Sequence, residues 1–385
     1  MFDMDTALFQ NSPSGRLAPI LGGEWDRHLA FVPNPLPPVL EWDDALISLI
    51  SKADRALGTL SGLGENIPNP HLLIYPFIRR EAVLSSRIEG TQSTFSDLLI
   101  FEATNKAKQQ DVKEVQNYVK ALECGLKRLE ELPVSLRLIR EIHLILMEGV
   151  RGERSKPGEF RQEPNWIGPE GYKLNEATFV PPPVPEMLET LNQLGKYLHS
   201  DVVLPPLIQI ALIHYQFEAI HPFLDGNGRI GRLLITFLLC EQKLLSKPLL
   251  YVSDFFERNR SKYYSLLLGV SQVGAWRQWI EFFLTGIIVQ SDDAKDRARS
   301  LLDSQHSYRK LGQDKRLPPT AQRLIEIIAG RPVLNAKLVQ QILNVTWEGA
   351  NKAIQGLVDV GILTEITGGK RDKIYVAQKI MEILK

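Results

Sequence analysis

The chain has 385 residues with 45 basic and 45 acidic side chains, so its formal net charge is zero. Hydrophobic residues at 44% and charged residues at 23% lie near the globular average and exclude a disordered, collagenous or coiled-coil protein. Because a domain usually holds about 100–200 residues, we expect two or three domains. Two cysteines, Cys124 and Cys240, are too few for a disulfide framework or a cysteine-rich zinc site, and they fit a reducing compartment.

The N-terminal stretch is acidic and polar where a secretory signal requires basic residues followed by an apolar run. No apolar stretch approaches the roughly 20 residues of a membrane span. The longest candidate, residues 204–213, is interrupted by Pro205, Pro206 and Gln209. We therefore expect a cytoplasmic protein with no membrane partner.

Turn-forming residues dominate the first 45 positions, and apolar residues then recur at helical spacing through most of the following chain. We expect helices at residues 42–60, 75–89, 112–132, 135–147, 184–198, 204–220, 229–242, 258–270 and 274–297. The exception is residues 160–183, where Gly-Pro sequences separate two short extended runs. This pattern predicts a hairpin or flap.

The chain changes character after Pro318 and Pro319, which mark a linker. Residues 301–385 carry 13 basic and 8 acidic side chains, so a mildly basic tail follows a mildly acidic body. Helices expected at 320–329, 335–343 and 346–360, followed by strands at 363–366 and 373–376, resemble a winged helix-turn-helix domain.

The electrostatics of this tail favour DNA only weakly. The helix at 346–360 sets Lys352 against Glu348 and Asp359, although the turn with Lys370 and Arg371 is basic. DNA is therefore left open as a partner, behind a protein-contact or oligomerisation role.

The chemistry is concentrated in one stretch, HPFLDGNGRIGR, at residues 221–232. The flanking helices are apolar almost all round, which is typical of helices buried in the centre of a fold. Ionisable groups next to such a core must be paired or bound to a ligand. The loop is therefore predicted to be a binding or catalytic site.

Three chemistries compete for this loop. Gly226, Gly228 and Gly231 satisfy the spacing of a dinucleotide fingerprint, but that motif follows a strand and here a helix precedes it. Glu218 and His221 have the spacing used by carboxylate-bridged metal bundles, but no second Glu-x-x-His pair stands out. Phosphate binding is the third reading, and it is the one we favour.

Phosphate binding accounts for each residue type in the loop. Gly226 and Gly228 allow close backbone approach, so N–H groups at the start of the next helix can face an anion. Arg229 and Arg232 lie three apart on one helical face and can clamp a polyphosphate. Asp225 offers the hard oxygen that Mg²⁺ prefers. His221 titrates near neutrality and can accept the proton of an attacking hydroxyl as a general base.

The stretch resembles the Fic motif, HPFx(D/E)GNGRxxR, at every defined position. Fic proteins are all-helical enzymes that mostly transfer AMP from ATP to a hydroxyl side chain of a target protein. The resemblance implies that His221 is the base that activates the target Ser, Thr or Tyr, and that Asp225 is the Mg²⁺ ligand. It implies nucleotide contacts, with an anion hole at the α-phosphate and arginine contacts beyond it, from Gly226, Asn227, Gly228, Arg229, Ile230, Gly231 and Arg232.

Two other segments resemble parts of the same family. Residues 178–183, TFVPPP, look like the end of the family's flap, a hairpin that aligns the target segment by main-chain pairing. Tyr263 and Tyr264, after Asn259 and Arg260, resemble residues that line the adenine pocket in some members, although core packing is an equally good reading.

A third resemblance concerns regulation. The stretch from Ser85 to Gly90 matches the family's inhibitory motif, (S/T)xxxE(G/N), with Glu89 as its glutamate. In that family the glutamate pairs with the second arginine of the Fic motif, which is Arg232 here, and ATP then binds in an unproductive orientation. The resemblance extends to the N-terminal extension at residues 22–89. The alternative is an ordinary surface glutamate at a helix end that Gly90 terminates.

We therefore expect a mainly α fold, with an all-helical Fic core, a β-hairpin flap and a small C-terminal winged helix-turn-helix domain. The domains expected are 1–110, 111–300 and 301–385. The expected function is autoinhibited transfer of AMP from Mg-ATP to target hydroxyls and to the chain itself. Homo-oligomerisation is left open. The alternatives are a nucleotide-sensing DNA-binding regulator, or a Fic enzyme that removes AMP or transfers another phosphate-linked group.

Overall fold

The computed structural model describes residues 4–26, 28–65, 70–104, 111–150, 156–168, 177–201, 203–369 and 372–385. Helices account for most of these residues and strands for few, which confirms the predicted mainly helical class. None of the helices in these ranges combines the length and the hydropathy that a membrane crossing requires. The chain forms two compact units, Met1–Gly58 with Lys120–Leu245 and Val252–Val289, and Thr59–Val119 with Ser246–Tyr251 and Gln290–Lys385.

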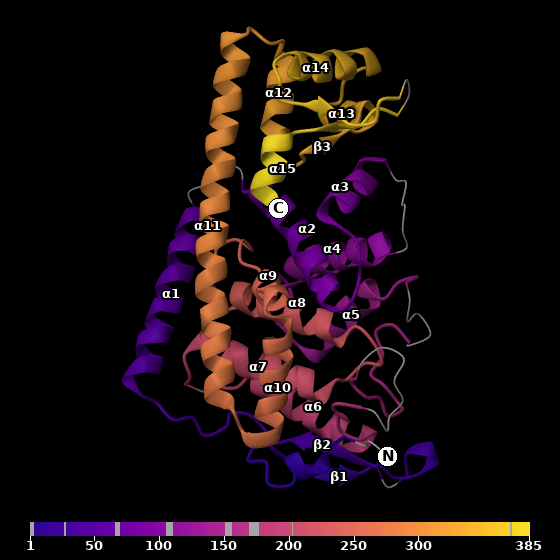
Figure 1. The fold of residues 1–385 in the computed structure, drawn as a ribbon, viewed down its shortest axis with the longest axis vertical. Helices are drawn as coiled ribbons and strands as arrows, with labels where there is room; N and C mark the ends of the chain where they lie inside the picture. Colours follow the sequence, from indigo (N-terminus) through magenta and orange to yellow (C-terminus); the bar gives the residue numbers. More distant parts are fainter. Residues whose placement is uncertain are drawn as a thin grey trace. The chain divides into compact units, whose positions relative to one another are not determined.

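The first unit contains the N-terminal strands and most of the central helices (Figure 1). Its elements are η1 Thr6–Leu8, β1 Gly15–Pro19, η2 Gly23–Trp25, β2 Leu29–Pro33, α5 Leu136–Leu146, α6 Val184–Leu198, α7 Pro206–Ile220, α8 Asn227–Glu241, α9 Ser253–Arg258 and α10 Arg260–Val273. Three helices, α1 Asp44–Glu65, α4 Asp111–Arg128 and α11 Trp276–Asp314, contribute residues to both units.

The N-terminal residues form an antiparallel hairpin where the sequence predicts only turns. β1 pairs with β2 in the register Gly15↔Pro33 to Pro19↔Leu29. Phe31 of β2 packs its ring 5.9 Å from that of Phe179, and its N–H donates to the carbonyl of Val180 at 2.9 Å. These contacts to a segment about 150 residues away stabilise short strands whose own sequence signal is weak.

Helices α7 and α8 form the centre of the first unit. Their apolar residues are almost all buried, as predicted from the absence of a polar face. Pro206 starts α7 at its first turn, where a missing N–H costs nothing. Trp279 of α11 donates its indole N–H to the carbonyl of Ala211 at 2.9 Å, so the long helix packs on α7.

The described part of the predicted flap forms a narrow hairpin stem. Ile167 and Phe179 make an antiparallel bridge, with N–H to carbonyl distances of 2.8 Å and 3.1 Å. Residues 169–176, at the predicted tip, lie outside the described residues. The small β-hairpin of the predicted fold class is therefore present.

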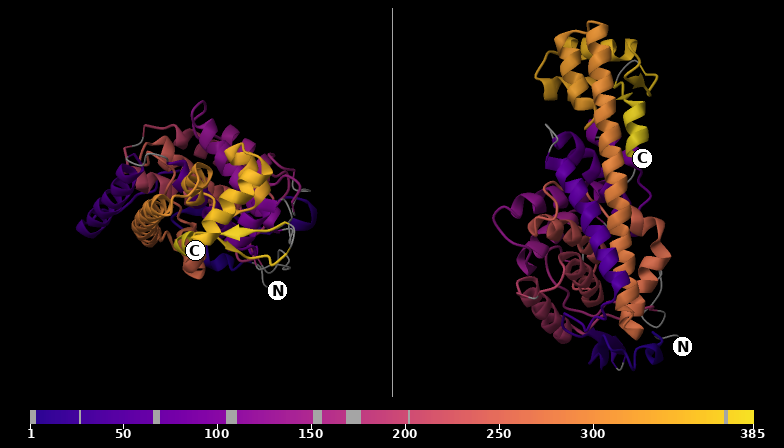
Figure 2. Two further views of the ribbon diagram at one scale, coloured as in Figure 1. Left: turned by 90° about the horizontal axis from the view of Figure 1, so that it is seen from above. Right: turned by 90° about the vertical axis from the view of Figure 1, so that its left-hand side faces the viewer.

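The second unit contains the helix with the predicted inhibitory motif and the C-terminal segment. Its elements are α2 His71–Ile88, α3 Phe95–Thr104, α12 Pro319–Ile328, β3 Val333–Leu334, α13 Ala336–Leu343, α14 Trp347–Asp359, β4 Thr364–Glu365, β5 Tyr375–Val376 and α15 Gln378–Leu384. In Figure 2 the C-terminal helices and strands gather around the upper end of α11.

The C-terminal segment contains the predicted helices and strands in the predicted order, together with β3 and α15, which the sequence does not predict. Its sheet has the order β3-β5-β4, with both pairs antiparallel. The side chains of Asn335 and Thr346 cap α13 and α14 by accepting the N–H groups of Leu338 and Gly349 at 2.7 Å and 3.1 Å. Lys370 and Arg371 of the predicted wing lie outside the described residues. The winged-helix assignment and DNA binding stay predictions.

Besides the N-terminal hairpin and β3, several helices differ from the sequence expectation. Helices α3, α9 and α15 were not predicted, because each is short and its apolar spacing covers only two or three turns. Helix α11 continues to Asp314, beyond the predicted end at residue 297 and through the domain boundary predicted at residue 300. The three-domain division stays a prediction beside the two compact units.

Candidate functional site

The motif at residues 221–232 is a tight connection between the two central helices. His221 ends α7 in the left-handed conformation, with φ 50° and ψ 60°. Gly226, with φ 80°, begins α8. A Cβ at Gly226 would lie 2.9 Å from the sulfur of Met147, so glycine is required there by both conformation and space.

Asn227 locks this loop with its side chain. Its Oδ1 accepts the N–H of Phe223 at 2.9 Å, and its Nδ2 donates to the carbonyl of Phe223 at 2.8 Å. Asn165 donates to the same carbonyl at 2.9 Å. These bonds leave the second Nδ2 hydrogen and the backbone N–H of Asn227 as donors for an anion. Its part in the predicted anion hole stays a prediction.

The N-terminus of α8 has the features of an anion site. Its N-cap is Gly226, which carries no side chain to cap the helix. The first backbone hydrogen bond of the helix runs from Ile230 N–H to the Gly226 carbonyl at 3.0 Å. The N–H groups of Asn227 and Gly228 precede it and have no acceptor within the helix. Together with the helix dipole they favour a negative charge.

The two arginines of the motif lie on the buried side of this helix start. Arg229 and Arg232 are 4% and 1% exposed. Arg229 Nη2 lies 3.4 Å from Asp225 Oδ1 and 3.7 Å from the sulfur of Met147. Two buried cations in the first two turns after a positive helix end raise the local potential, which suits a polyanion such as the phosphate chain of a nucleotide.

His221 is the partly exposed titratable group at the other end of the loop. Its Nδ1 lies 3.3 Å from the carbonyl of Glu218, and a carbonyl can only accept. Nδ1 therefore carries the proton of the neutral ring, and Nε2 is the basic nitrogen. The arrangement permits the general-base role predicted for His221.

Asp225 is the exposed carboxylate of the loop, with 48% of its side chain accessible. Its Oδ1 accepts the N–H of Gly226 at 2.5 Å and contacts Arg229, while Oδ2 accepts no hydrogen bond within the described residues. One outward carboxylate oxygen fits a cation held mainly by phosphate oxygens. In the described ranges, no group of three or more His, Cys, Asp or Glu side chains could hold a metal by itself.

Two buried histidines support the motif, a role that their sequence positions do not indicate. His143 accepts the N–H of Gly158 at Nδ1 and so donates from Nε2 to the Asp225 carbonyl, at 2.8 Å and 3.0 Å. Its ring stacks on Phe223 at 3.7 Å. Burial lowers the pKa of His143 to about 4, so the ring is neutral at neutral pH.

His214 supports the second turn of α8 in the same way. Its Nδ1 donates to the Gly231 carbonyl at 3.0 Å, and its Nε2 accepts from the hydroxyl of Tyr263 at 2.9 Å. Burial lowers the pKa of His214 to about 3, so this ring is also neutral. Tyr263 is 1% exposed and stacks on Phe256 at 4.5 Å.

These contacts bear on the predicted adenine pocket. Tyr263 packs in the core, which is the alternative that the sequence leaves open, whereas Tyr264 is 39% exposed. A nucleotide contact for either tyrosine stays a prediction, and the exposed ring of Tyr264 is the better placed for stacking on a base.

Ile230 and Gly231 have packing roles in the motif. Ile230 is 1% exposed. A Cβ at Gly231 would lie 2.2 Å from Glu218 Oε1, so the glycine leaves room for that carboxylate. The direct nucleotide contacts predicted for Ile230 and Gly231 stay predictions.

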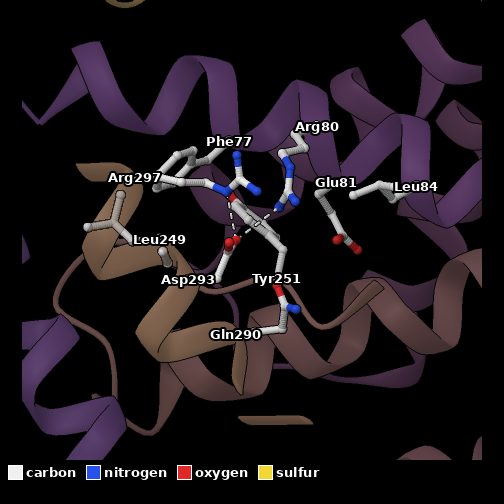
Figure 3. A pocket seen from close by; sticks show the side chains of 10 residues that line it. Phe77, Arg80, Glu81, Leu84, Leu249, Tyr251, Gln290, Asp293 and Arg297 are labelled. Carbon is white, nitrogen blue, oxygen red and sulfur yellow. Dashed lines mark hydrogen bonds and ion pairs between the residues drawn. The ribbon is translucent and has the colours of Figure 1, made fainter. Parts of the chain in front are cut away.

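Glu89 lies at the C-cap of α2 in the second unit and is exposed. Arg232 belongs to the first unit, and their pairing stays a prediction. Within the second unit, a small pocket lies beside α2 (Figure 3). Its charged lining is an ion network rather than an anion site, because Arg297 and Arg80 share the carboxylate of Asp293 at 2.7 Å and 3.5 Å.

Comparison with known proteins identifies two matching family profiles. Residues 47–127 match the Fic/DOC family N-terminal profile, and residues 133–239 match the Fic/DOC family profile. The second match covers the loop, α7, most of α8 and the described part of the hairpin stem.

Two curated relatives and one solved structure are similar to this chain. A probable protein adenylyltransferase of Aquifex aeolicus is 40% identical over 114 residues, 26% of this chain and 32% of that protein. The protein adenylyltransferase Fic of Drosophila erecta is 26% identical over 202 residues, 51% of this chain and 37% of that protein. The matched region thus spans only about a third of the length of each relative.

The structural similarity extends further along the chain. A Fic family protein from Desulfovibrio desulfuricans G20 has a TM-score of 0.58 at 20% identity, over 89% of this chain and 98% of that one. At this identity the similarity shows a shared fold.

Proposed function

The chain belongs to the Fic/DOC family, and from this premise we propose that it is a protein adenylyltransferase that moves AMP from ATP to hydroxyl side chains of target proteins. Both curated relatives are named as protein adenylyltransferases, one of them as probable. The observation that carries the proposal is the pairing, in one short loop, of a basic imidazole nitrogen with an uncapped helix N-terminus.

The chemistry follows from that pairing. The polyphosphate of ATP binds at the start of α8, with the N–H groups of Asn227 and Gly228 at the α-phosphate and the cations of Arg229 and Arg232 beyond it. Nε2 of His221 accepts the proton of the target hydroxyl as its oxygen attacks the α-phosphorus. The bond from that phosphorus to the bridging oxygen breaks, and pyrophosphate leaves.

Magnesium fits the same arrangement. Asp225 would hold Mg²⁺ through its outward carboxylate oxygen, together with phosphate oxygens of the nucleotide. A bound Mg²⁺ neutralises charge on the phosphates during transfer. The charge contact between Arg229 and Asp225 keeps the carboxylate oriented toward the helix start.

The target enters along the hairpin stem in this proposal. The backbone of the stem at Ile167 and Phe179 is extended, and a target strand beside it would be aligned by main-chain hydrogen bonds. Such alignment places a Ser, Thr or Tyr hydroxyl without requiring one target sequence. We include in the proposal the transfer of AMP to hydroxyl side chains of the chain itself.

We also propose that Glu89 restrains the activity. Its carboxylate, at the exposed end of α2, would neutralise Arg232 and deprive the γ-phosphate of its anchor. The matching sequence motif and the family assignment support this proposal. An enzyme that removes AMP could instead use Glu89 as a catalytic group.

Incubation of the purified chain with ATP labelled at the α-phosphate tests the proposal. Covalent label on protein, lost when the label is moved to the γ-phosphate, is the expected result. A nucleotide-sensing regulator would bind ATP and leave no covalent label, which would refute the proposed transfer.

A further inference from the structure

Arg161 is a buried cation that the chemistry above does not use. Arg161 is 3% exposed. The guanidinium donates from Nε to the His221 carbonyl at 3.0 Å, from Nη1 to the Glu163 carbonyl at 3.2 Å, and from Nη2 to the Pro182 carbonyl. Its backbone N–H donates to the carbonyl of Pro222 at 2.9 Å.

These partners make Arg161 unusual among buried charges. All three side-chain hydrogen bonds described go to backbone carbonyls rather than to a carboxylate. Burial lowers the pKa of Arg161 to about 10, so the group stays charged at neutral pH. A charge is costly to bury unless it is well paired. Three carbonyl contacts in a fixed fork are a geometry that lysine cannot reproduce.

The three carbonyls belong to three separate backbone segments. His221 is at the loop that holds the proposed base. Glu163 and Pro182 lie on the two arms that lead into and out of the Ile167–Phe179 bridge. Arg161 thus joins both arms of the hairpin stem to the loop of His221.

Neighbouring contacts hold each arm of the stem in place. Asn165, on the first arm, donates to the Phe223 carbonyl of the loop at 2.9 Å. On the second arm, the Val180 carbonyl accepts the N–H of Phe31 in β2. Each of these contacts joins two backbone segments, whereas Arg161 contacts the loop and both arms.

We propose that Arg161 is a positioning residue that sets the separation between the His221 imidazole and a target segment lying along the hairpin stem. This proposal rests on the proposed function. Proton transfer requires the hydroxyl within about 3 Å of the base, and a displacement of about 1 Å costs roughly 100-fold in rate. Transfer to water needs no segment on the hairpin, so Arg161 should matter more for transfer to protein than for hydrolysis of ATP to AMP.

The kinetic test compares Arg161→Ala, Arg161→Lys and the wild type, with dephosphorylated casein as the hydroxyl-bearing probe and labelled ATP at saturation. We expect the ratio of protein labelling to AMP release to fall by roughly 10- to 100-fold in Arg161→Ala, with partial recovery in Arg161→Lys. ATP affinity should stay unchanged, because Arg161 does not touch the start of α8. Arg137→Ala, which removes an exposed arginine of α5, is the matched control and should keep the wild-type ratio.

A second measurement does not depend on activity. Hydrogen exchange should accelerate at the amides of Ile167 and Phe179 in Arg161→Ala, while amides in the middle of α7 and α8 keep their protection. An unchanged labelling ratio with unchanged exchange at the stem would overturn the role of Arg161, as would equal acceleration throughout the unit. If the wild type labels neither casein nor itself, the proposed function fails, and the exchange experiment still decides whether Arg161 holds the stem.

Discussion

Substitution of Gly231 by alanine tests whether the second turn of α8 is as tightly packed as the contacts indicate. A Cβ there would lie 2.2 Å from Glu218 Oε1 and 3.2 Å from His214 Cε1. The carboxylate can rotate away, but the imidazole is held by two hydrogen bonds, to the Gly231 carbonyl and to Tyr263. The new methyl group therefore meets one yielding and one fixed neighbour.

The magnitude follows from two opposing contributions. Alanine in place of glycine within a helix stabilises by about 1 kcal/mol because it restricts the unfolded chain. Overpacking a filled site costs about 1–3 kcal/mol. We expect the cost to exceed the gain, with a net loss of about 1–2 kcal/mol in the free energy of unfolding and a lower Tm.

The matched control is Gly58→Ala in α1. A Cβ at Gly58 would meet nothing within 4 Å, so only the gain of about 1 kcal/mol should apply. Thermal unfolding of both variants and the wild type gives the comparison, and ATP binding reports on the site. A Gly231→Ala variant as stable as Gly58→Ala would refute the packing that we describe around Glu218 and His214.

Three further predictions concern regulation, an ion network and pH. If the restrained state is favoured by about 2–3 kcal/mol, Glu89→Gly should raise protein labelling by roughly 30- to 150-fold. Adding Arg232→Ala should remove that gain. Unchanged labelling in the single variant would show that Glu89 is an ordinary surface residue. Asp293→Ala removes the carboxylate that Arg80 and Arg297 share, and it should lower the free energy of unfolding by about 1–2 kcal/mol. The control Asp292→Ala removes an exposed partner of Lys295 and should change the free energy of unfolding by less than about 0.5 kcal/mol. Equal effects of the two variants would contradict the ion network. The pKa of His143 is about 4 in the folded chain, below the ordinary value near 6.5, so the unfolded state binds the proton more tightly and the free energy of unfolding should fall as the pH is lowered from 6.5 to 4. In denaturant titrations a His143→Gln variant should lose less of its free energy of unfolding over that range. The same pH dependence in the variant and the wild type would argue against a buried neutral imidazole.

Much of the helical fold could be predicted because the apolar spacing and the helix ends agree. The predicted helix at 184–198 coincides with α6, and Asn335 and Thr346 sit at the caps of α13 and α14. The N-terminal hairpin could not be predicted, since β2 gains its partners from Phe179 and Val180 in a distant part of the chain. Helix α11 was underestimated because its polar second half lacks a continuous apolar stripe.

The residues of the candidate site were predicted through the motif, but the support beneath them was not. Histidine spacing alone cannot show that His143 and His214 donate to carbonyls of the loop and of α8. Arg161 follows a Gly-Glu-Phe sequence that carries no sign of a buried charge. These roles depend on contacts between segments 17 to 82 residues apart, which only the folded chain brings together.

The most direct test of the proposed transfer compares the Glu89→Gly variant with the double variant Glu89→Gly, His221→Ala. Both are incubated with ATP labelled at the α-phosphate. The base contributes to the transition state and little to nucleotide binding, so we predict that labelling falls by at least about 100-fold while the Kd for ATP stays within about twofold. Near-normal labelling in the His221→Ala variant would remove His221 from the mechanism. A matching loss of ATP affinity would contradict its role as a base and assign it to binding instead.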